Sequence, residues 1–330
     1  MVQARQIVVY ARAALMGWYP DGRQTAMRAF ETICRQYPAP DGGVGWIFSL
    51  NPDGSVADAT RDLYCHAFLL YMLAWMYRLT GDPAVLATAD NTLSDLDRIF
   101  ATAGELGFVS QVPGRVDLRE QNPHMHLFEA LLSLAEVSKA ERYLARARSL
   151  MGLFDRSLTT ATGIVLEKFD ANWQPVRPPG ANHFEPGHQM EWAWLLREWQ
   201  RLTLQPVDER VHRLTASAVG LGIDTDRGLV RSIVGEDGLI VSSASRTWPQ
   251  TEAIRALCRE DPQGAAWPGL VSAIMDNLFA THLPAPLNGG WIDQLDEDGM
   301  AVIEFMPAST LYHLAGAAMD CQAIFQSQSN

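Results

Sequence analysis

Six polar residues recur along the sequence at a nearly constant spacing of 60 to 64 residues. Most of them are histidines, which titrate near neutral pH, so that a pair can supply one base and one acid. Two of the histidines are followed three residues later by a glutamate, in the pairs His126–Glu129 and His188–Glu191. Residues three apart share a helix face, so each carboxylate can orient or polarise its imidazole. In chain order, the six residues are Arg5, His66, His126, His188, Glu252 and His313.

This set suits the removal of a proton next to a carbonyl group. A helix N-terminus lowers the pKa of an imidazole and favours developing negative charge. Arg5 could stabilise an enediolate oxygen. Glycoside hydrolysis fits less well, because it usually requires two carboxylates across the scissile bond. Trp46, Trp248 and Trp291 lie in predicted hairpins or at the start of a helix, where an aromatic face could stack on a sugar ring.

Each polar residue also has a purely structural interpretation. His66 lies among apolar neighbours, so we predict a hydrogen-bonded core histidine there and expect leucine to be tolerated. The shared phase of the other three histidines favours a functional role for them. Arg5 and Glu252 could instead form a structural ion pair. Three further histidines lie off phase and are predicted to be loop or surface residues: His183, His212 and His282.

The sequence favours chemistry without a metal or cofactor. The rival for the two His-x-x-Glu pairs is a di-metal helical bundle, which uses Glu-x-x-His and extra glutamates from other helices. Here the order of the two residue types is reversed, and no further carboxylate pair is evident. P-loop, dinucleotide and G-x-S-x-G patterns are absent. We therefore expect no metal and no cofactor.

Glycine-rich stretches divide the chain into repeats of about sixty residues, with the glycines at Gly42, Gly107, Gly163, Gly228 and Gly289. Each stretch has the turn chemistry of a short strand or hairpin. Between the stretches lie pairs of helical patterns, and one member of each pair is apolar nearly all round. A helix without a polar face must be buried. The repeat therefore predicts an all-α fold, an (α/α)6 barrel with short β-hairpins at one end.

The helices can be counted from these patterns. Inner helices are predicted near residues 3–16, 62–79, 122–138, 187–203, 249–260 and 308–322. Outer helices are predicted near residues 22–37, 82–102, 139–158, 206–221 and 263–281. We therefore expect the sixth outer helix to be lacking: either the barrel closes imperfectly, or an outer N-terminal helix upstream of Met1 is missing. The Pro-rich segment 175–187 is predicted to be a long loop rather than a linker, so residues 1–330 form one catalytic domain.

Composition excludes several classes of partner. The chain has 330 residues, 48% of them hydrophobic, with 26 Lys+Arg against 38 Asp+Glu and a net charge of −12. Without a basic block, neither nucleic acid nor an anionic membrane is an expected partner. The longest uncharged apolar run, between Asp62 and Arg78, is shorter than the roughly 18 residues that a membrane span needs. The four scattered cysteines fit a reducing compartment. We expect a soluble, cytoplasmic monomer or homodimer.

Five stretches resemble the N-acylglucosamine 2-epimerase superfamily, which includes mannose isomerases and cellobiose 2-epimerases. They run in the order of the family over most of the chain, and the wording of NPHMHLFEA and EPGHQMEWAWLL is most similar to the mannose isomerases. Members of this family usually have an additional N-terminal segment with an outer helix. The matching stretches are RDLYCHAFLLY (61–71), QNPHMHLFEALL (121–132), FEPGHQMEWAWLL (184–196), RTWPQTEAIRA (246–256) and PASTLYHLAGA (307–317).

The resemblance implies an (α/α)6 barrel and metal-free interconversion of a sugar through a cis-enediolate. It implies that His188 and His313 are the acid/base histidines. It further implies sugar-contacting or supporting roles at Arg5, His126, Glu191, Trp248 and Glu252. Trp291 is a further candidate substrate-binding residue, because of its place in a predicted hairpin rather than because of the resemblance.

We therefore predict an isomerase that interconverts an unphosphorylated aldose and ketose of the mannose and fructose type. The alternatives are a sugar 2-epimerase of the N-acylglucosamine or cellobiose type, a non-catalytic sugar-binding barrel, and a glycosidase on the same barrel. For the isomerase, the epimerase and the sugar-binding barrel, the expected partner is a small-molecule sugar.

Overall fold

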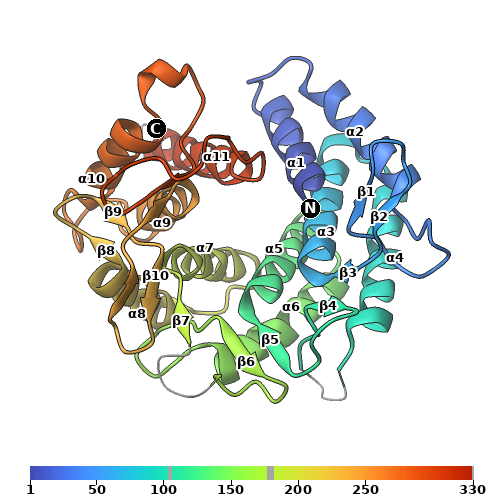
Figure 1. Cartoon of the computed structure of the whole chain (residues 1–330), viewed down its shortest axis with the longest axis horizontal. Coiled ribbons are helices and arrows are strands. Elements are labelled where there is room, and N and C mark those ends of the chain that lie inside the picture. The colour runs from blue at the N-terminus through green and yellow to red at the C-terminus, as the bar shows by residue number, and fades with distance from the viewer. Residues whose placement is uncertain (103–105, 177–181, 329–330) are drawn as a thin grey trace. The chain divides into compact units, whose positions relative to one another are not determined.

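A computed structural model describes residues 1–102, 106–176 and 182–328, and the chain divides into two compact units (Figure 1). The first unit comprises residues 1–158 and 168–175, and the second comprises residues 159–167 and 176–330. Residues 177–181 of the predicted loop 175–187 lie outside the described part of the chain. The prediction of a single catalytic domain is not tested by this division and stays a prediction.

The first unit contains three pairs of helices and three short two-stranded sheets. The antiparallel strand pairs are β1–β2, β3–β4 and β5–β6. Its helices are α1 (Val2–Leu15), α2 (Gly22–Gln36), α3 (Leu63–Thr80), α4 (Pro83–Phe100), α5 (Gln121–Ser138) and α6 (Glu141–Leu153) with a π-helical turn at Phe154–Leu158. Its strands are β1 (Ser49–Leu50), β2 (Val56–Asp58), β3 (Arg61–Asp62), β4 (Gln111–Val112), β5 (Leu118–Glu120) and β6 (Lys168–Asp170).

The second unit repeats this plan. Strands β7, β10 and β11 form one sheet, while β8–β9 and β12–β13 form two antiparallel pairs. Its helices are α7 (Pro186–Thr203), α8 (Asp208–Ser217), α9 (Thr247–Glu260), α10 (Leu270–Asn277) and α11 (Leu311–Gln328), with shorter helical turns at Ala218–Gly222, Leu278–His282 and Ala285–Leu287. Its strands are β7 (His183–Phe184), β8 (Ile223–Asp224), β9 (Leu229–Val230), β10 (Ile233–Gly235), β11 (Ile240–Ser242), β12 (Ser245–Arg246) and β13 (Gln294–Leu295).

The described residues thus hold eleven α-helices, and they correspond to the six inner and five outer helices predicted from the sequence. Two boundaries were wrong. Helix α10 begins at Leu270 rather than near 263, because the Asp261 carboxylate accepts the N–H groups of residues 265–267 and holds them as a loop. Helix α11 continues past 322 to Gln328, through a stretch that contains neither Gly nor Pro.

Helix α3 shows how the sequence forms a buried helix. Asp62 caps its N-terminus by accepting the N–H of Cys65 at 2.7 Å, and Gly81 ends it in the left-handed region at φ 70°. Its residues are apolar on every face, and it packs against α1, α4 and α5. Figure 1 shows these helices of the first unit side by side. Removal of this apolar surface from water is what stabilises the unit.

One side chain ties each of four buried helices to the hairpin that precedes it. The fourth residue of the helix accepts a backbone N–H from that hairpin, and the chain uses either histidine or glutamine for the purpose. The four bonds run from Trp46 N to His66 Nε2 (3.2 Å), from Phe108 N to His124 Nε2 (3.0 Å), from Val165 N to Gln189 Oε1 (3.1 Å) and from Val230 N to Gln250 Oε1 (2.9 Å). We call these four side chains the latch residues.

The latch corrects the predicted phase of His66. His66 is the fourth residue of α3 and matches His124 in α5, whereas His126 is the sixth residue of α5. Its Nδ1 bonds to the Asp62 carbonyl at 2.8 Å, so that Nε2 is the accepting nitrogen of a neutral ring. Burial is the main reason that the pKa of His66 is lowered to about 4. The prediction of a hydrogen-bonded core histidine is confirmed.

Within the described residues, no helix combines the length and the apolar character that crossing a bilayer would require.

The latch predicts a difference between two substitutions of His66. His66→Leu is expected to lower the free energy of unfolding by roughly 2 kcal/mol, because it leaves the buried Trp46 N–H without a partner and removes the side-chain bond to the Asp62 carbonyl. This reverses the expectation from sequence that leucine is tolerated. His66→Gln should lose much less, since glutamine fills the same helix position at Gln189 and Gln250. Urea unfolding at pH 7 measures both, and equal stability of the two variants would contradict the latch.

Candidate active site

The predicted site residues fall in both units. Arg5 and His126 belong to the first unit, and the other six belong to the second.

His188 is the third residue of α7, and a carboxylate holds its ring. Its Nδ1 donates to Oε1 of Glu167 at 2.9 Å, and Glu185 lies at 3.9 Å. Glu167 is itself fixed to β7, because its N–H bonds to the His183 carbonyl at 3.1 Å. Burial alone would lower the pKa of His188, but the nearby charges of Glu167 and Glu185 outweigh burial and raise it to about 10. His188 is therefore charged at neutral pH.

His313 is held in a similar way at the third position of α11. Its Nδ1 lies 2.7 Å from Oε1 of Glu252, the sixth residue of α9, and both side chains are buried. The residue directly before α11, Thr310, donates its hydroxyl to the buried carboxylate of Asp293. This bond fixes the start of α11 and with it the height of His313.

Trp248 brings the two histidines to one place. The centroid of its ring lies 4.9 Å from that of His188 and 5.4 Å from that of His313. The close approach requires glycine at 187, because a Cβ there would lie 2.5 Å from the Trp248 ring. Three predicted residues, on three helices, thus lie together, with both histidine rings tilted against the ring of Trp248.

Glu191 is not the carboxylate that bonds to the Nδ1 of His188, although the His-x-x-Glu spacing predicted that it would be. That nitrogen bonds to Glu167, and the charge of Glu191 raises the pKa of His188 less than that of Glu167 does. Glu191 is fully buried, and its carboxylate lies within 4.8 Å of ligand atoms of Glu252 and His313. Sequence reasoning missed Glu167, since a distance of 21 residues across a hairpin leaves no periodic signal.

Trp291 is less closely connected to the histidines. Its backbone N–H points to the sulfur of Met306 at 3.3 Å. Within the part of the chain that the structure describes, its ring makes no contact with His188 or His313. Its predicted role in substrate binding stays a prediction.

A second cluster lies in the first unit around His126. The Nδ1 of His126 lies 3.1 Å from Oε2 of Glu129, as the His-x-x-Glu spacing predicted. The His126 ring packs against Tyr64 and Phe68, with centroids 5.1 and 4.5 Å away. Arg5 donates to the Tyr64 hydroxyl and places its guanidinium 4.0 Å from the Phe68 ring centroid. Arg5 and His126 therefore share two aromatic neighbours that the sequence analysis did not single out.

Metal binding would compete with these hydrogen bonds. Glu191, Glu252 and His313 present ligand atoms within 4.8 Å of one another, as do Glu167, Glu185 and His188. In both groups, however, the histidine Nδ1 already bonds to a carboxylate. The expectation that no metal is needed stays a prediction.

His282 is not the surface residue that its off-phase position suggested. It is fully buried, and its ring nitrogens contact the Ser245 hydroxyl at 2.9 Å and the Ile292 carbonyl at 2.7 Å. Burial lowers its pKa. His282 thus joins β12 to the segment before β13 as a structural residue.

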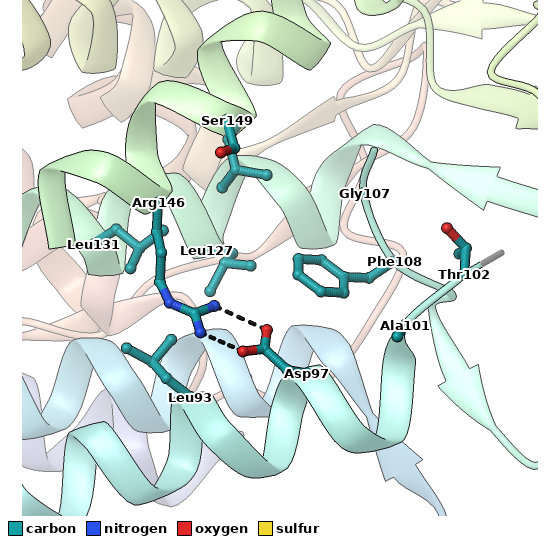
Figure 2. Close-up of a pocket in the computed structure, with 11 residues that line it drawn as sticks. Leu93, Asp97, Ala101, Thr102, Gly107, Phe108, Leu127, Leu131, Arg146 and Ser149 are labelled. Atoms are coloured by element: carbon teal, nitrogen blue, oxygen red, sulfur yellow. Dashed lines mark hydrogen bonds and ion pairs between the residues drawn. The ribbon is translucent and has the colours of Figure 1, made fainter. Parts of the chain in front are cut away.

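A separate hollow of about 350 Å³ lies in the first unit between α4, α5 and α6 (Figure 2). Figure 2 shows Leu93, Leu127 and Leu131 on its walls, with Arg146 paired to Asp97 across it. Because it contains none of the predicted site residues and its one charge pair is already matched, we assign it no role in the chemistry.

Comparison with solved structures identifies the class of fold. A D-mannose isomerase structure matches with a TM-score of 0.84 at 21% sequence identity, over 98% of this chain and 86% of that one. This likeness shows the fold, and the predicted (α/α)6-barrel class is confirmed.

Residues 1–317 match the family model for N-acylglucosamine 2-epimerase (GlcNAc 2-epimerase), and the chain belongs to that family. One relative is a mannose-6-phosphate isomerase of Rhizobium meliloti (strain 1021), 32% identical over 97% of this chain and 84% of that protein. Another is a cellobiose 2-epimerase of Bacteroides fragilis, 26% identical over 70% of this chain and 62% of that protein. The chain is thus an enzyme of the sugar isomerase and epimerase class.

The His188–Glu167 pair predicts a measurable change in titration. Glu167→Gln removes the charge that raises the pKa of His188 most, so we expect that pKa to fall from about 10 by one unit or more. Glu185→Gln is the matched control and should shift it less, because Glu185 lies farther away and more exposed. NMR of the ring carbons and nitrogens of His188 follows both.

The same pair sets a pH dependence of stability. The pKa of His188 is raised above its unfolded value near 6.5, so its stabilising effect is complete below that pH and is lost as the pH rises through about 10. In Glu167→Gln this alkaline loss should shrink. Urea unfolding at pH 6.5 and pH 9.5 gives the comparison, and an unchanged difference between wild type and variant would rule out the assigned coupling.

Proposed function

We propose that this chain isomerises an unphosphorylated aldohexose to the corresponding ketose, and that it interconverts mannose and fructose. The observation that carries the proposal is the shared position of His188 and His313 against the ring of Trp248. Each ring donates or shares its Nδ1 hydrogen with a buried carboxylate, which leaves its Nε2 for proton transfer. Two such nitrogens beside the same tryptophan ring could act as the acid and the base in a reaction on a sugar.

The charge of each histidine would determine whether it acts as the general acid or as the general base. His188, with its pKa raised to about 10, is the acid at neutral pH, and His313 is the base. With the sugar ring open, His313 takes the proton from C2 while His188 protonates the carbonyl oxygen on C1, which gives the enediol through a cis-enediolate. His313 then returns its proton to C1, and the hydroxyl on C2 gives its proton back to His188. The product is the ketose, with both histidines restored.

The choice of mannose rests on the relatives. The names of two similar proteins, a D-mannose isomerase and a mannose-6-phosphate isomerase, both contain this sugar. We favour the unphosphorylated form because the described residues of the second unit place one half-exposed guanidinium near Trp248 rather than a phosphate cradle. That group, Arg246, lies 5.9 Å from the Trp248 ring and is already near Asp293, at 3.9 Å.

Epimerisation at C2 is the second candidate, and the relative named cellobiose 2-epimerase favours it. An epimerase returns the proton to the opposite face of C2, so it needs an active group on each face of the sugar. His188 and His313 could supply the two groups. A barrel that binds sugar without turnover is a third hypothesis. The two histidines, each bonded to a carboxylate, argue against it.

We further propose that Arg5, His126, Glu191, Trp248, Glu252 and Trp291 contact or support the sugar. A single catalytic domain over residues 1–330, a cytoplasmic location and a monomer or homodimer stay predictions, as do the absence of a cofactor and of a nucleic-acid partner.

Proton NMR with D-mannose in D2O tests the reaction directly. Fructose carrying deuterium at C1 is expected, and it would establish isomerisation by proton transfer with solvent exchange. Glucose as the first product would favour the epimerase instead. A lack of exchange with mannose, mannose 6-phosphate, glucose, N-acetylmannosamine and cellobiose would overturn both in favour of the binding protein.

Substitution of the histidines tests their roles. His188→Ala and His313→Ala are each expected to reduce turnover at least about 100-fold, because each removes one general acid or base. His212→Ala is the control, since His212 is exposed on α8 and only stacks near Trp267. Circular dichroism and thermal unfolding confirm that each variant folds. Substantial turnover in a folded His188→Ala or His313→Ala variant would remove that residue from the acid/base pair.

A further inference from the structure

Arg255 stands directly behind the His313–Glu252 pair. It lies one helical turn after Glu252 on α9 and is buried, with 2% of its surface exposed. Its Nη1 donates to Oε2 of Glu252 at 3.2 Å, while Oε1 of the same carboxylate faces His313 at 2.7 Å. The two oxygens of Glu252 thus have donors from two different helices, which fixes the plane of the carboxylate.

Arg255 is itself held from two further sides. Its Nε donates to the carboxylate of Asp320 on α11. Its guanidinium lies over the ring of Trp194 on α7, 3.4 Å from the centroid. A planar guanidinium fits both contacts at once, which an ammonium group would not. Side chains from three helices therefore determine where Arg255 points.

Stability alone is a weak reason for such an arrangement. Buried ion pairs recover little more than their cost of desolvation, and apolar residues of similar volume often stabilise a protein as well. The charge lies instead against the carboxylate that bonds to a histidine of the predicted site. The charges that act most on His188 are three carboxylates, Glu167, Glu185 and Glu191, whereas the carboxylate of His313 is shared with an arginine.

We propose that Arg255 is a positioning residue for His313: it orients the Glu252 carboxylate, and its positive charge opposes a second positive charge on the imidazole. His313 is then kept with its proton on Nδ1 and its Nε2 ready to accept one. The assignment of His313 as base rests on the proposed function, but the orientation and charge effects do not. Among the described residues, the ionisable groups nearest His313 include Glu252, Glu191 and Tyr312. Arg255 and Asp320 lie behind Glu252, and His188 lies beyond Trp248.

The test compares two arginines on one helix. Arg255→Met removes the charge behind Glu252, and Arg259→Met is the matched control, since Arg259 pairs with Glu198 and also joins α9 to α7. The first readout is the titration of the His313 ring by NMR in the protein without sugar. Its midpoint should rise by about one pH unit, a tenfold gain in proton affinity, in Arg255→Met and stay at the wild-type value in Arg259→Met.

The second readout is kinetic. In Arg255→Met the acidic limb of the pH–rate profile should move to higher pH, and kcat at pH 7 should fall about 10-fold with little change in KM. Arg255→Lys keeps the positive charge but loses the planar guanidinium that donates to two carboxylates at once. The titration of His313 in this variant should therefore match wild type, while kcat stays reduced. If the methionine variant does not fold, the lysine variant carries the test, and wild-type kcat in it would overturn the positioning role.

A folded Arg255→Met with the wild-type titration midpoint would overturn the proposal, and so would an equal shift in Arg259→Met. Failure of the proposed function looks different. In that case wild type itself turns over none of the sugars, while the titration of His313 still shows whether Arg255 acts on it.

Discussion

The first turns of four buried helices are fixed by a backbone N–H of the preceding hairpin that must find an acceptor. Where a Gly-rich hairpin meets a helix, the latch residue supplies that acceptor, and unsatisfied buried N–H groups are costly. Gln189 shows the consequence for the site: it binds Val165 and the Gly163 carbonyl, and so fixes the turn that carries His188. In α11 a leucine stands at the fourth position, and the Thr310–Asp293 bond fixes the start instead. The position of His188 thus follows from the satisfaction of backbone groups, and that of His313 from a side-chain bond at the start of its helix.

The electrostatics of the two histidines differ although their geometry is alike. Both bond through Nδ1 to a buried carboxylate near 2.7–2.9 Å. The surroundings of His188 are acidic, while Arg255 offsets part of the charge of Glu252. An acid and a base that work at the same pH need environments that move their proton affinities apart. Arg255, paired with Glu252, is a difference that can move the proton affinity of His313 away from that of His188. It does so without adding a group to the surface that a sugar would contact.

Most of the fold could be predicted from the sequence, because the repeat of about sixty residues and the apolar helices are local signals. The His126–Glu129 pair could be predicted as well, since both residues lie on one helix. The spacing misled for His66, because an error of two residues rotates a side chain by about 200° around a helix. Glu167 and the role of Arg255 could not be predicted at all. Their partners come from other elements, and only the tertiary fold brings them together.

The group that contacts Nδ1 separates the structural histidines of this chain from the candidate acid/base histidines, and it does so better than spacing or burial does. In His66, His124 and His282 a backbone carbonyl contacts Nδ1, and for each of them burial lowers the pKa, so they are neutral structural groups. In the other three buried histidines a carboxylate occupies that place. A carbonyl fixes a tautomer without stabilising a positive charge strongly, whereas a carboxylate fixes the tautomer and also compensates the charge of the imidazolium. The second kind can therefore carry a positive charge in a buried site near neutral pH, which is the property that the proposed isomerisation requires.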